Sequence, residues 1–93
     1  MNPARHHFLS FRHPPARLNM EEAAWFLGFL PHEIPILIAA NLLKPLGSPA
    51  PNAVKYFALF ELRLLRRNLA WLAKASNAIS RHWKTKNQRH SMK

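Results

Sequence analysis

Apolar and polar residues first follow a helical pattern after Asn19. The side chain of Asn19 suits a helix cap, and Glu22 stands three residues later, which is the capping-box spacing with Asn in place of Ser or Thr. Apolar residues then recur on one face up to Leu27. Gly28 follows at the place where helices commonly end in the left-handed conformation. The pattern predicts a short helix between Asn19 and Gly28.

A second helical pattern begins near Pro31. Pro35 is harmless in the first turn of a helix and costs about 3 kcal/mol deeper inside it, so the helix should start between Pro31 and Glu33. Aliphatic residues continue at helical spacing, and the pattern stops near Ala40 or Asn41. We therefore expect a second helix directly after the first, separated from it by a short turn.

Two short extended segments follow, at 42–46 and 54–57. The residues between them are rich in Gly, Ser, Pro and Asn, which favours a turn. These segments predict a small β-hairpin whose tip cannot pair completely, because Pro49 and Pro51 have no amide hydrogen to donate. From Ala58 the pattern becomes helical again. The predicted fold is therefore mainly α with a small β-hairpin.

The C-terminal segment has the most regular pattern in the chain. Apolar residues at steps of three and four form one narrow stripe, made of Leu62, Leu65, Leu69, Leu72, Ser76, Ile79 and Trp83. A second, mostly basic stripe lies nearly opposite and contains Arg63, Arg67, Ala70, Lys74, Asn77, Arg81 and Lys84. The apolar stripe indicates core packing or a dimer seam. Asn68 could cap a new helix, so the pattern leaves open whether the helix bends there.

Positive charge is distributed unevenly over the 93 residues, whose formal net charge is +10. Within residues 17–65 four basic and four acidic residues cancel, so the whole excess lies before and after this segment. A neutral middle with basic ends indicates a polyanionic partner, although a high net charge also keeps a small protein dispersed. Residues 1–16 hold three prolines and no periodic pattern, which predicts a flexible arm.

Several functional classes find no support in the composition. The chain has no Cys, four acidic residues that are all Glu, and two Gly, which disfavours thiolate metal sites, nucleotide-binding loops and paired-carboxylate catalysis. His6, His7 and His13 lie together but lack further ligands to complete a metal site. There is no transmembrane-length apolar run and no secretory signal pattern. We expect a cytoplasmic, non-enzymatic protein with no metal, cofactor, membrane or small-molecule substrate.

The order of these features resembles the winged helix-turn-helix of the excisionase and MerR type. The segments that carry the resemblance are LNMEEAAWFLGF, HEIPILIAANLLKPLG and ALFELRLL, and the likeness runs without gaps from Leu18 through Lys44. The resemblance implies that residues 21–27 form the first helix of the motif, residues 32–40 the recognition helix and residues 44–57 the wing. The HWKTKN ending is also similar to that of a group of short bacterial proteins.

The recognition helix that the resemblance implies is poor in groups that read bases. It would face a DNA groove with Pro31, His32, Glu33, Pro35, Ile36 and Ala39. Only His32 and Glu33 among these carry polar side-chain atoms, whereas direct readout relies mainly on Arg, Lys, Asn and Gln. Three interpretations stay open for this helix: weak base readout, ordinary packing, or docking of a protein on its apolar face.

The sequence as a whole predicts a flexible arm at 1–16, a winged helix-turn-helix domain at 17–66, a C-terminal basic amphipathic helix at 67–86 and a disordered tail at 87–93. We expect nucleic-acid binding, to double-stranded DNA before RNA, as a transcriptional regulator or excisionase-like accessory factor. The expected nucleic-acid contacts are Arg63, Arg67, Lys74, Arg81, Lys84, Lys44, Lys55 and His32.

The alternative function is a protein-interaction adaptor, with a homodimer as one form of it. Its expected partner-binding residues are Pro35, Ile36, Ala39, Leu69, Leu72 and Ile79. A basic amphipathic helix on an anionic membrane surface is the third interpretation. Because the chain carries Arg66 and Ser76 on or near its apolar side, we rank the membrane interpretation last.

Overall fold

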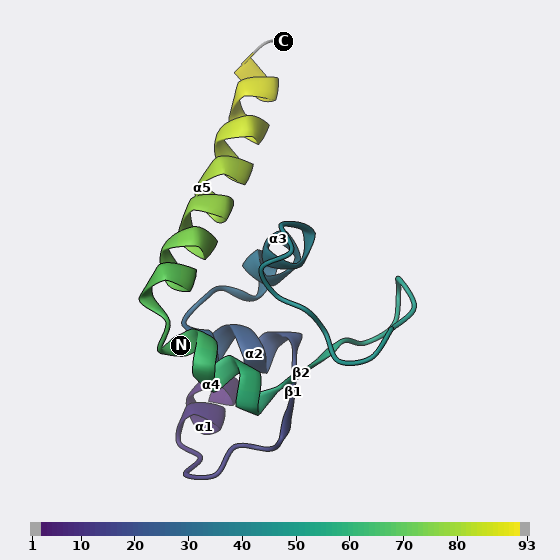
Figure 1. Cartoon of the computed structure of the whole chain (residues 1–93), viewed down its shortest axis with the longest axis vertical. Helices are drawn as coiled ribbons and strands as arrows, with labels where there is room; N and C mark the ends of the chain where they lie inside the picture. The colour runs from purple at the N-terminus through teal and green to yellow at the C-terminus, as the bar shows by residue number, and fades with distance from the viewer. Residues whose placement is uncertain (1–2, 92–93) are drawn as a thin grey trace.

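The chain folds into short helices around a two-stranded sheet, followed by one long helix (Figure 1). The computed structural model describes the backbone of residues 3–91 and the side chains of residues 3–87. The elements are α1 (Pro3–Leu9), β1 (Arg17–Asn19), α2 (Met20–Leu27), the 3₁₀ turn η1 (Pro31–Glu33), α3 (Ile34–Ala39), β2 (Tyr56–Ala58), α4 (Leu59–Arg66) and α5 (Leu69–Ser91). The prediction of a mainly helical fold with a small antiparallel β element is confirmed.

Helix α2 begins and ends where its sequence signals indicate. The Asn19 side chain accepts a hydrogen bond from the backbone N–H of Glu22 at 2.8 Å, and the Glu22 carboxylate accepts one from the backbone N–H of Asn19 at 3.0 Å. At the other end Gly28 adopts φ of 91°, and its N–H donates to the carbonyl of Ala24. Both caps satisfy backbone groups that a helix leaves unpaired at its termini, and both predictions are confirmed.

The sheet pairs different segments from those the sequence predicts. β2 forms close to the expected position, but its partner is β1, with Leu18 opposite Phe57. The expected first strand of a hairpin at 42–46 is wrong: it contributes one bond, from the N–H of Leu46 to the carbonyl of Tyr56 at 2.8 Å. Pro45 has no amide to extend that ladder, whereas pairing β1 with β2 buries Leu18 and Phe57 to 0% and 1% exposure.

The N-terminal segment differs from the expected flexible arm. Residues 3–9 form α1, while residues 1–2 lie outside the described residues. Phe8 is 5% exposed, and its ring centroid lies 6.0 Å from that of Trp25 on α2. Burying an aromatic ring of this size stabilises the contact enough to hold one short helix against the domain.

The core lies where α2, α3 and α4 meet the sheet. Its most deeply buried large side chains are Leu18, Ile34, Leu37, Phe57 and Leu62. These side chains come from four elements, β1, α3, β2 and α4, so the core requires all of them to assemble. Helix α3 stops at Ala39, and Asn41 follows with φ of 61°, which turns the chain away from the helix axis.

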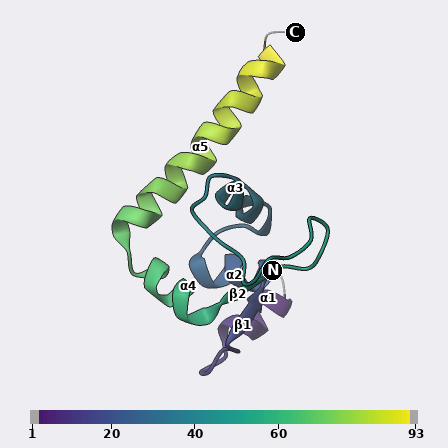
Figure 2. The same ribbon diagram turned by 45° about the vertical axis from the view of Figure 1, so that its right-hand side comes forward.

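Helices α4 and α5 are separate and change direction at residues 67–68 (Figures 1 and 2). The Asn68 side chain accepts a hydrogen bond from the backbone N–H of Trp71 at 3.0 Å, so Asn68 caps α5 as one of the two sequence alternatives predicts. The indole N–H of Trp71 also donates to the carbonyl of Leu42 at 2.8 Å. This hydrogen bond and the burial of Trp71 attach the start of α5 to the body.

The packed face of α5 differs from the predicted apolar stripe. Trp71, Ala75 and Ile79 are buried, whereas Leu69 is 81% exposed and Trp83 is 38% exposed. The break before Asn68 changes the rotational phase of the helix, so the stripe that begins on α4 does not continue along one face of α5. The helix also extends beyond the predicted end at residue 86 to Ser91, while residues 92–93 of the predicted tail lie outside the described residues.

Candidate nucleic-acid interface

Three of the predicted cations gather on one face of α5. Lys74, Arg81 and Lys84 are exposed, and they lie within about 80° of one another around the helix axis. Their mean direction is about 130° away from the face that carries Trp71, Ala75 and Ile79. The basic face, as we call Lys74, Arg81 and Lys84, is therefore turned away from the core.

Two further predicted cations, one on α4 and one directly after its last residue, form a separate group. Arg63 and Arg67 are exposed and one helical turn apart. Because α4 and α5 point in different directions, these two arginines do not continue the line of the basic face (Figure 2). The neighbouring Arg66, which the prediction omits, lies with its guanidinium carbon 4.8 Å from the centroid of the Phe26 ring. The predicted basic stripe is thus divided into two groups at residues 67–68.

The predicted wing cations are engaged with their own loop or lie near an acidic residue. Lys55 is half-buried, and its ammonium donates a hydrogen bond to the carbonyl of Pro51 at 3.3 Å. Lys44 is exposed and shares a shallow hollow with Glu61. Neither lysine lies on α5, so the segment predicted as a wing does not enlarge the basic face.

All four acidic residues precede α5 in the sequence. The Glu22 carboxylate caps α2, and the Glu33 carboxylate accepts a hydrogen bond from the backbone N–H of Leu30 at 2.8 Å. After Glu61 the sequence contains no further Asp or Glu. The field of the α5 cations is therefore not offset by an acidic residue of the same helix.

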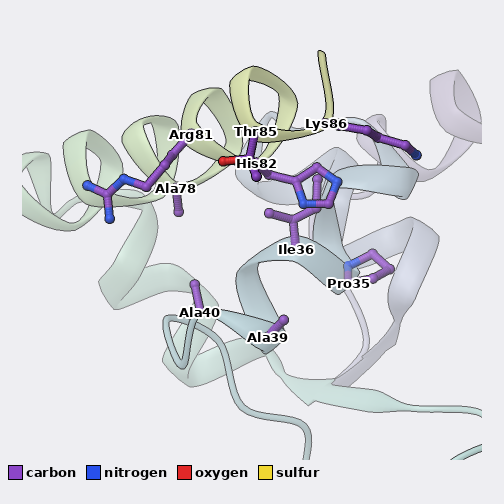
Figure 3. Close-up of a pocket in the computed structure, with 9 residues that line it drawn as sticks. All are labelled: Pro35, Ile36, Ala39, Ala40, Ala78, Arg81, His82, Thr85 and Lys86. Carbon is purple, nitrogen blue, oxygen red and sulfur yellow. The ribbon is translucent and has the colours of Figure 1, made fainter. Parts of the chain in front are cut away.

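The predicted recognition helix lies across a groove from α5. The groove has a volume of about 660 Å³. Its lining residues are Pro35, Ile36, Ala39 and Ala40 from α3 and its end, with Ala78, Arg81, His82, Thr85 and Lys86 from α5. In Figure 3 the His82 ring lies over Ile36, while Arg81 and Lys86 extend toward opposite ends. The outward face of α3 is thus one wall of a groove.

Other predicted site residues take different positions. His32 is exposed, and its ring centroid lies 6.1 Å from that of Trp83, which brings the start of α3 close to α5. Ile79 is buried, so its side chain stabilises this chain and is not part of an exposed partner surface. Leu69 is exposed and Leu72 is half-buried. The six predicted partner-binding residues therefore do not form one surface.

The sequence prediction misses five groove residues: Ala40, Ala78, His82, Thr85 and Lys86. The available signal is the spacing of Trp71, Ala75 and Ala78, which continues to His82 on the same face of α5. Alanine gives a weak hydrophobic signal, and the stronger leucine pattern predicts a neighbouring face of the helix as the buried one. Residues on and beside this alanine-containing face form the α5 wall of the groove.

Some kinds of site are not found among the described residues. Within 3–91, no helix has the length and apolarity that crossing a membrane would require. The described side chains include no group of three or more His or acidic residues arranged to hold a metal ion.

Compared with protein-family models, curated proteins and solved structures, the chain matches none of them.

Proposed function

We propose that this protein is a non-enzymatic nucleic-acid-binding protein that holds phosphates with the basic face of α5. The observation that carries the proposal is that Lys74, Arg81 and Lys84 are exposed together on a helix without acidic residues. Cations arranged in this way displace the counterions that surround nucleic acids, and the release of those ions favours binding. A helix face that only contacts solvent usually mixes acidic with basic residues, and this face has no acidic residue.

The spacing of the basic face fits a phosphate backbone. From residue 74 to residue 84 the helix rises about 15 Å, which corresponds to the axial rise of about four nucleotides of one strand in duplex DNA. Figure 1 shows that the C-terminal turns of α5 project beyond the rest of the molecule, so a long polymer has room to lie along them. This geometry favours backbone contacts that do not depend on base sequence.

The winged helix-turn-helix interpretation is part of the proposal, with α2 and α3 as its two motif helices. Base readout by α3 contributes little to affinity in this scheme, because Pro35, Ile36 and Ala39 offer no hydrogen bonds to bases. Orientation on double-stranded DNA comes from the motif and affinity comes from α5. A bacterial transcriptional regulator or an excisionase-like accessory factor in the cytoplasm would use such a weakly selective binding mode.

Fluorescence anisotropy with a labelled duplex of random sequence, measured over a series of salt concentrations, tests the proposal. Each phosphate contact contributes close to one unit to the slope of log affinity against log salt, so Lys74→Ala with Lys84→Ala should lower the slope by about two. The matched control is Arg12→Ala with Lys86→Ala, which removes two exposed cations outside the basic face. The control should leave the slope within about half a unit of the parent value.

Two results would overturn this function. One is the absence of measurable binding to duplex DNA, single-stranded DNA and RNA at low salt. The other is an equal loss of slope in both double variants, because net charge would then explain the binding without any particular face. Tighter binding of single-stranded DNA or RNA than of the duplex would keep the basic face and change the preferred nucleic acid.

A further inference from the structure

The groove between α3 and α5 has walls of opposite chemical character. The α3 side supplies Pro35, Ile36, Ala39 and Ala40, which present only apolar side-chain atoms. The α5 side supplies Arg81, His82, Thr85 and Lys86, which present two permanent cations, an imidazole and a hydroxyl. No acidic residue lines the groove. A matching ligand therefore needs an apolar stripe beside a row of negative charges.

We propose that this groove binds an acidic amphipathic helix of a partner protein. A helix of this kind places aliphatic residues at i, i+3, i+4 and i+7 on one face and carboxylates beside them. The aliphatic side chains would contact Ile36, Ala39 and Ala78, and the small alanines allow the two backbones to approach closely. The carboxylates would contact Arg81 and Lys86 at the two ends (Figure 3).

The openness of the groove favours a macromolecular segment over a small ligand. Seven of its nine lining residues are exposed, and only Ile36 and Ala78 are half-buried. A small-molecule site usually covers most of the surface of its ligand, which a groove this open does not do. A helix from a partner brings the rest of its own protein to cover the far side.

Aliphatic side chains distinguish this occupant from nucleic acid, and negative charge distinguishes it from a second copy of the chain. Nucleic acid has the negative charge but no aliphatic side chains for the α3 wall. A second copy carries a net charge of +10 and four acidic residues, and two of these, Glu22 and Glu33, already hold backbone amides. Like charges on two copies repel, whereas an acidic partner is attracted.

The basic face and the groove share Arg81, but they can be tested separately at Lys84 and Lys86, which lie on nearly opposite sides of α5. Two positions along a helix correspond to about 200° of rotation, so Lys86 lines the groove while Lys84 belongs to the basic face. Lys84→Glu and Lys86→Glu therefore change the net charge equally at exposed sites. They form a matched pair of variants.

The probe is a fluorescein-labelled synthetic peptide of about 18 residues with Leu at i, i+3, i+4 and i+7, Glu at the positions beside the leucines and Ala at the remaining positions. Ala favours the helix, and the smaller number of Glu pairs limits repulsion within it. A scrambled peptide of the same composition and poly-glutamate are the control ligands. Anisotropy with the full chain should show the amphipathic peptide binding at least about tenfold more tightly than the scrambled one. Lys86→Glu should weaken this binding about tenfold, and Lys84→Glu should weaken it less than about threefold.

A second variant tests the apolar wall. Ala39 is exposed and lines the groove, so Ala39→Glu should preserve the circular dichroism spectrum and still weaken the peptide about tenfold. Ala73→Glu, an exposed alanine of α5 outside the groove, is its control. If Lys86→Glu or Ala39→Glu alters the spectrum, the comparison of the amphipathic and scrambled peptides on the parent chain decides the result.

Equal affinity for the amphipathic and scrambled peptides, or equal effects of Lys84→Glu and Lys86→Glu on peptide binding, would overturn the groove proposal. Binding of duplex DNA should show the reverse order, with Lys84→Glu the more damaging variant. Failure of the nucleic-acid function would thus appear in the duplex titration alone, and failure of the groove would appear in the peptide titration alone.

Discussion

The body of residues 17–65 and helix α5 are built on different principles. The body has four basic and four acidic residues, two capping glutamates and a core of fully buried side chains. Helix α5 has no acidic residue, buries one narrow face and exposes most of its length. The difference teaches that most of the buried core and most of the excess positive charge lie in separate parts of the chain. Helix α5 carries a large share of that excess charge and, among its described side chains, adds only Trp71, Ala75 and Ile79 to the buried core.

The largest change in the free energy of unfolding should come from truncating a large buried side chain in the core of the body. Phe57 is 1% exposed on β2 and lies opposite Leu18, so Phe57→Ala should lower the free energy of unfolding by about 3–5 kcal/mol. Urea denaturation followed by circular dichroism measures the change. A loss below about 1 kcal/mol would contradict the claim that the sheet closes the core.

A smaller effect is expected at the connection between the two regions. Trp71→Phe keeps an aromatic ring but removes the indole N–H that bonds to the carbonyl of Leu42, which should cost about 1–3 kcal/mol. Amide hydrogen exchange should accelerate in the first turns of α5 more than in α2. Trp83→Phe, at a partly exposed indole, is the control and should leave the exchange pattern of the first turns unchanged. Equal acceleration in α2 and α5 would mean that the two regions unfold as one.

The smallest effect should come from the leucine at the start of α5. Leu69 is 81% exposed, so Leu69→Ala should change the free energy of unfolding by no more than about 0.5 kcal/mol. The same urea measurement applies, with the half-buried Leu72→Ala as a reference that should cost more. A loss above about 2 kcal/mol for Leu69→Ala would restore the leucine stripe as the packed face of the helix.

Signals that act within a few residues could be predicted from the sequence. Asn19, Glu22 and Gly28 satisfy backbone groups of their own helix, and Asn68 caps α5 as one of the two sequence alternatives predicts. In each case the partner group lies three or four residues away, so the spacing alone contains the information.

Features that depend on distant residues could not be predicted. The pairing of Leu18 with Phe57 joins segments almost 40 residues apart, and each strand is three residues long. Similarly, Phe8 shows its role only when Trp25 lies beside it. The groove combines α3 with the far half of α5, and its alanines carry little pattern of their own. Three-dimensional proximity, which no local spacing encodes, decided these features.

The absence of acidic residues from α5 has a consequence for the helix itself. Arg81 and Lys84 are three positions apart, where like charges repel, and no Glu of the same helix forms an attractive pair with either. At low salt, repulsion between these like charges therefore destabilises the C-terminal turns of α5. An anion bound to these cations would reduce their repulsion, so the C-terminal turns of α5 should become more rigid when the anion is bound. The increase in rigidity would then extend along α5 toward the change of direction at residues 67–68.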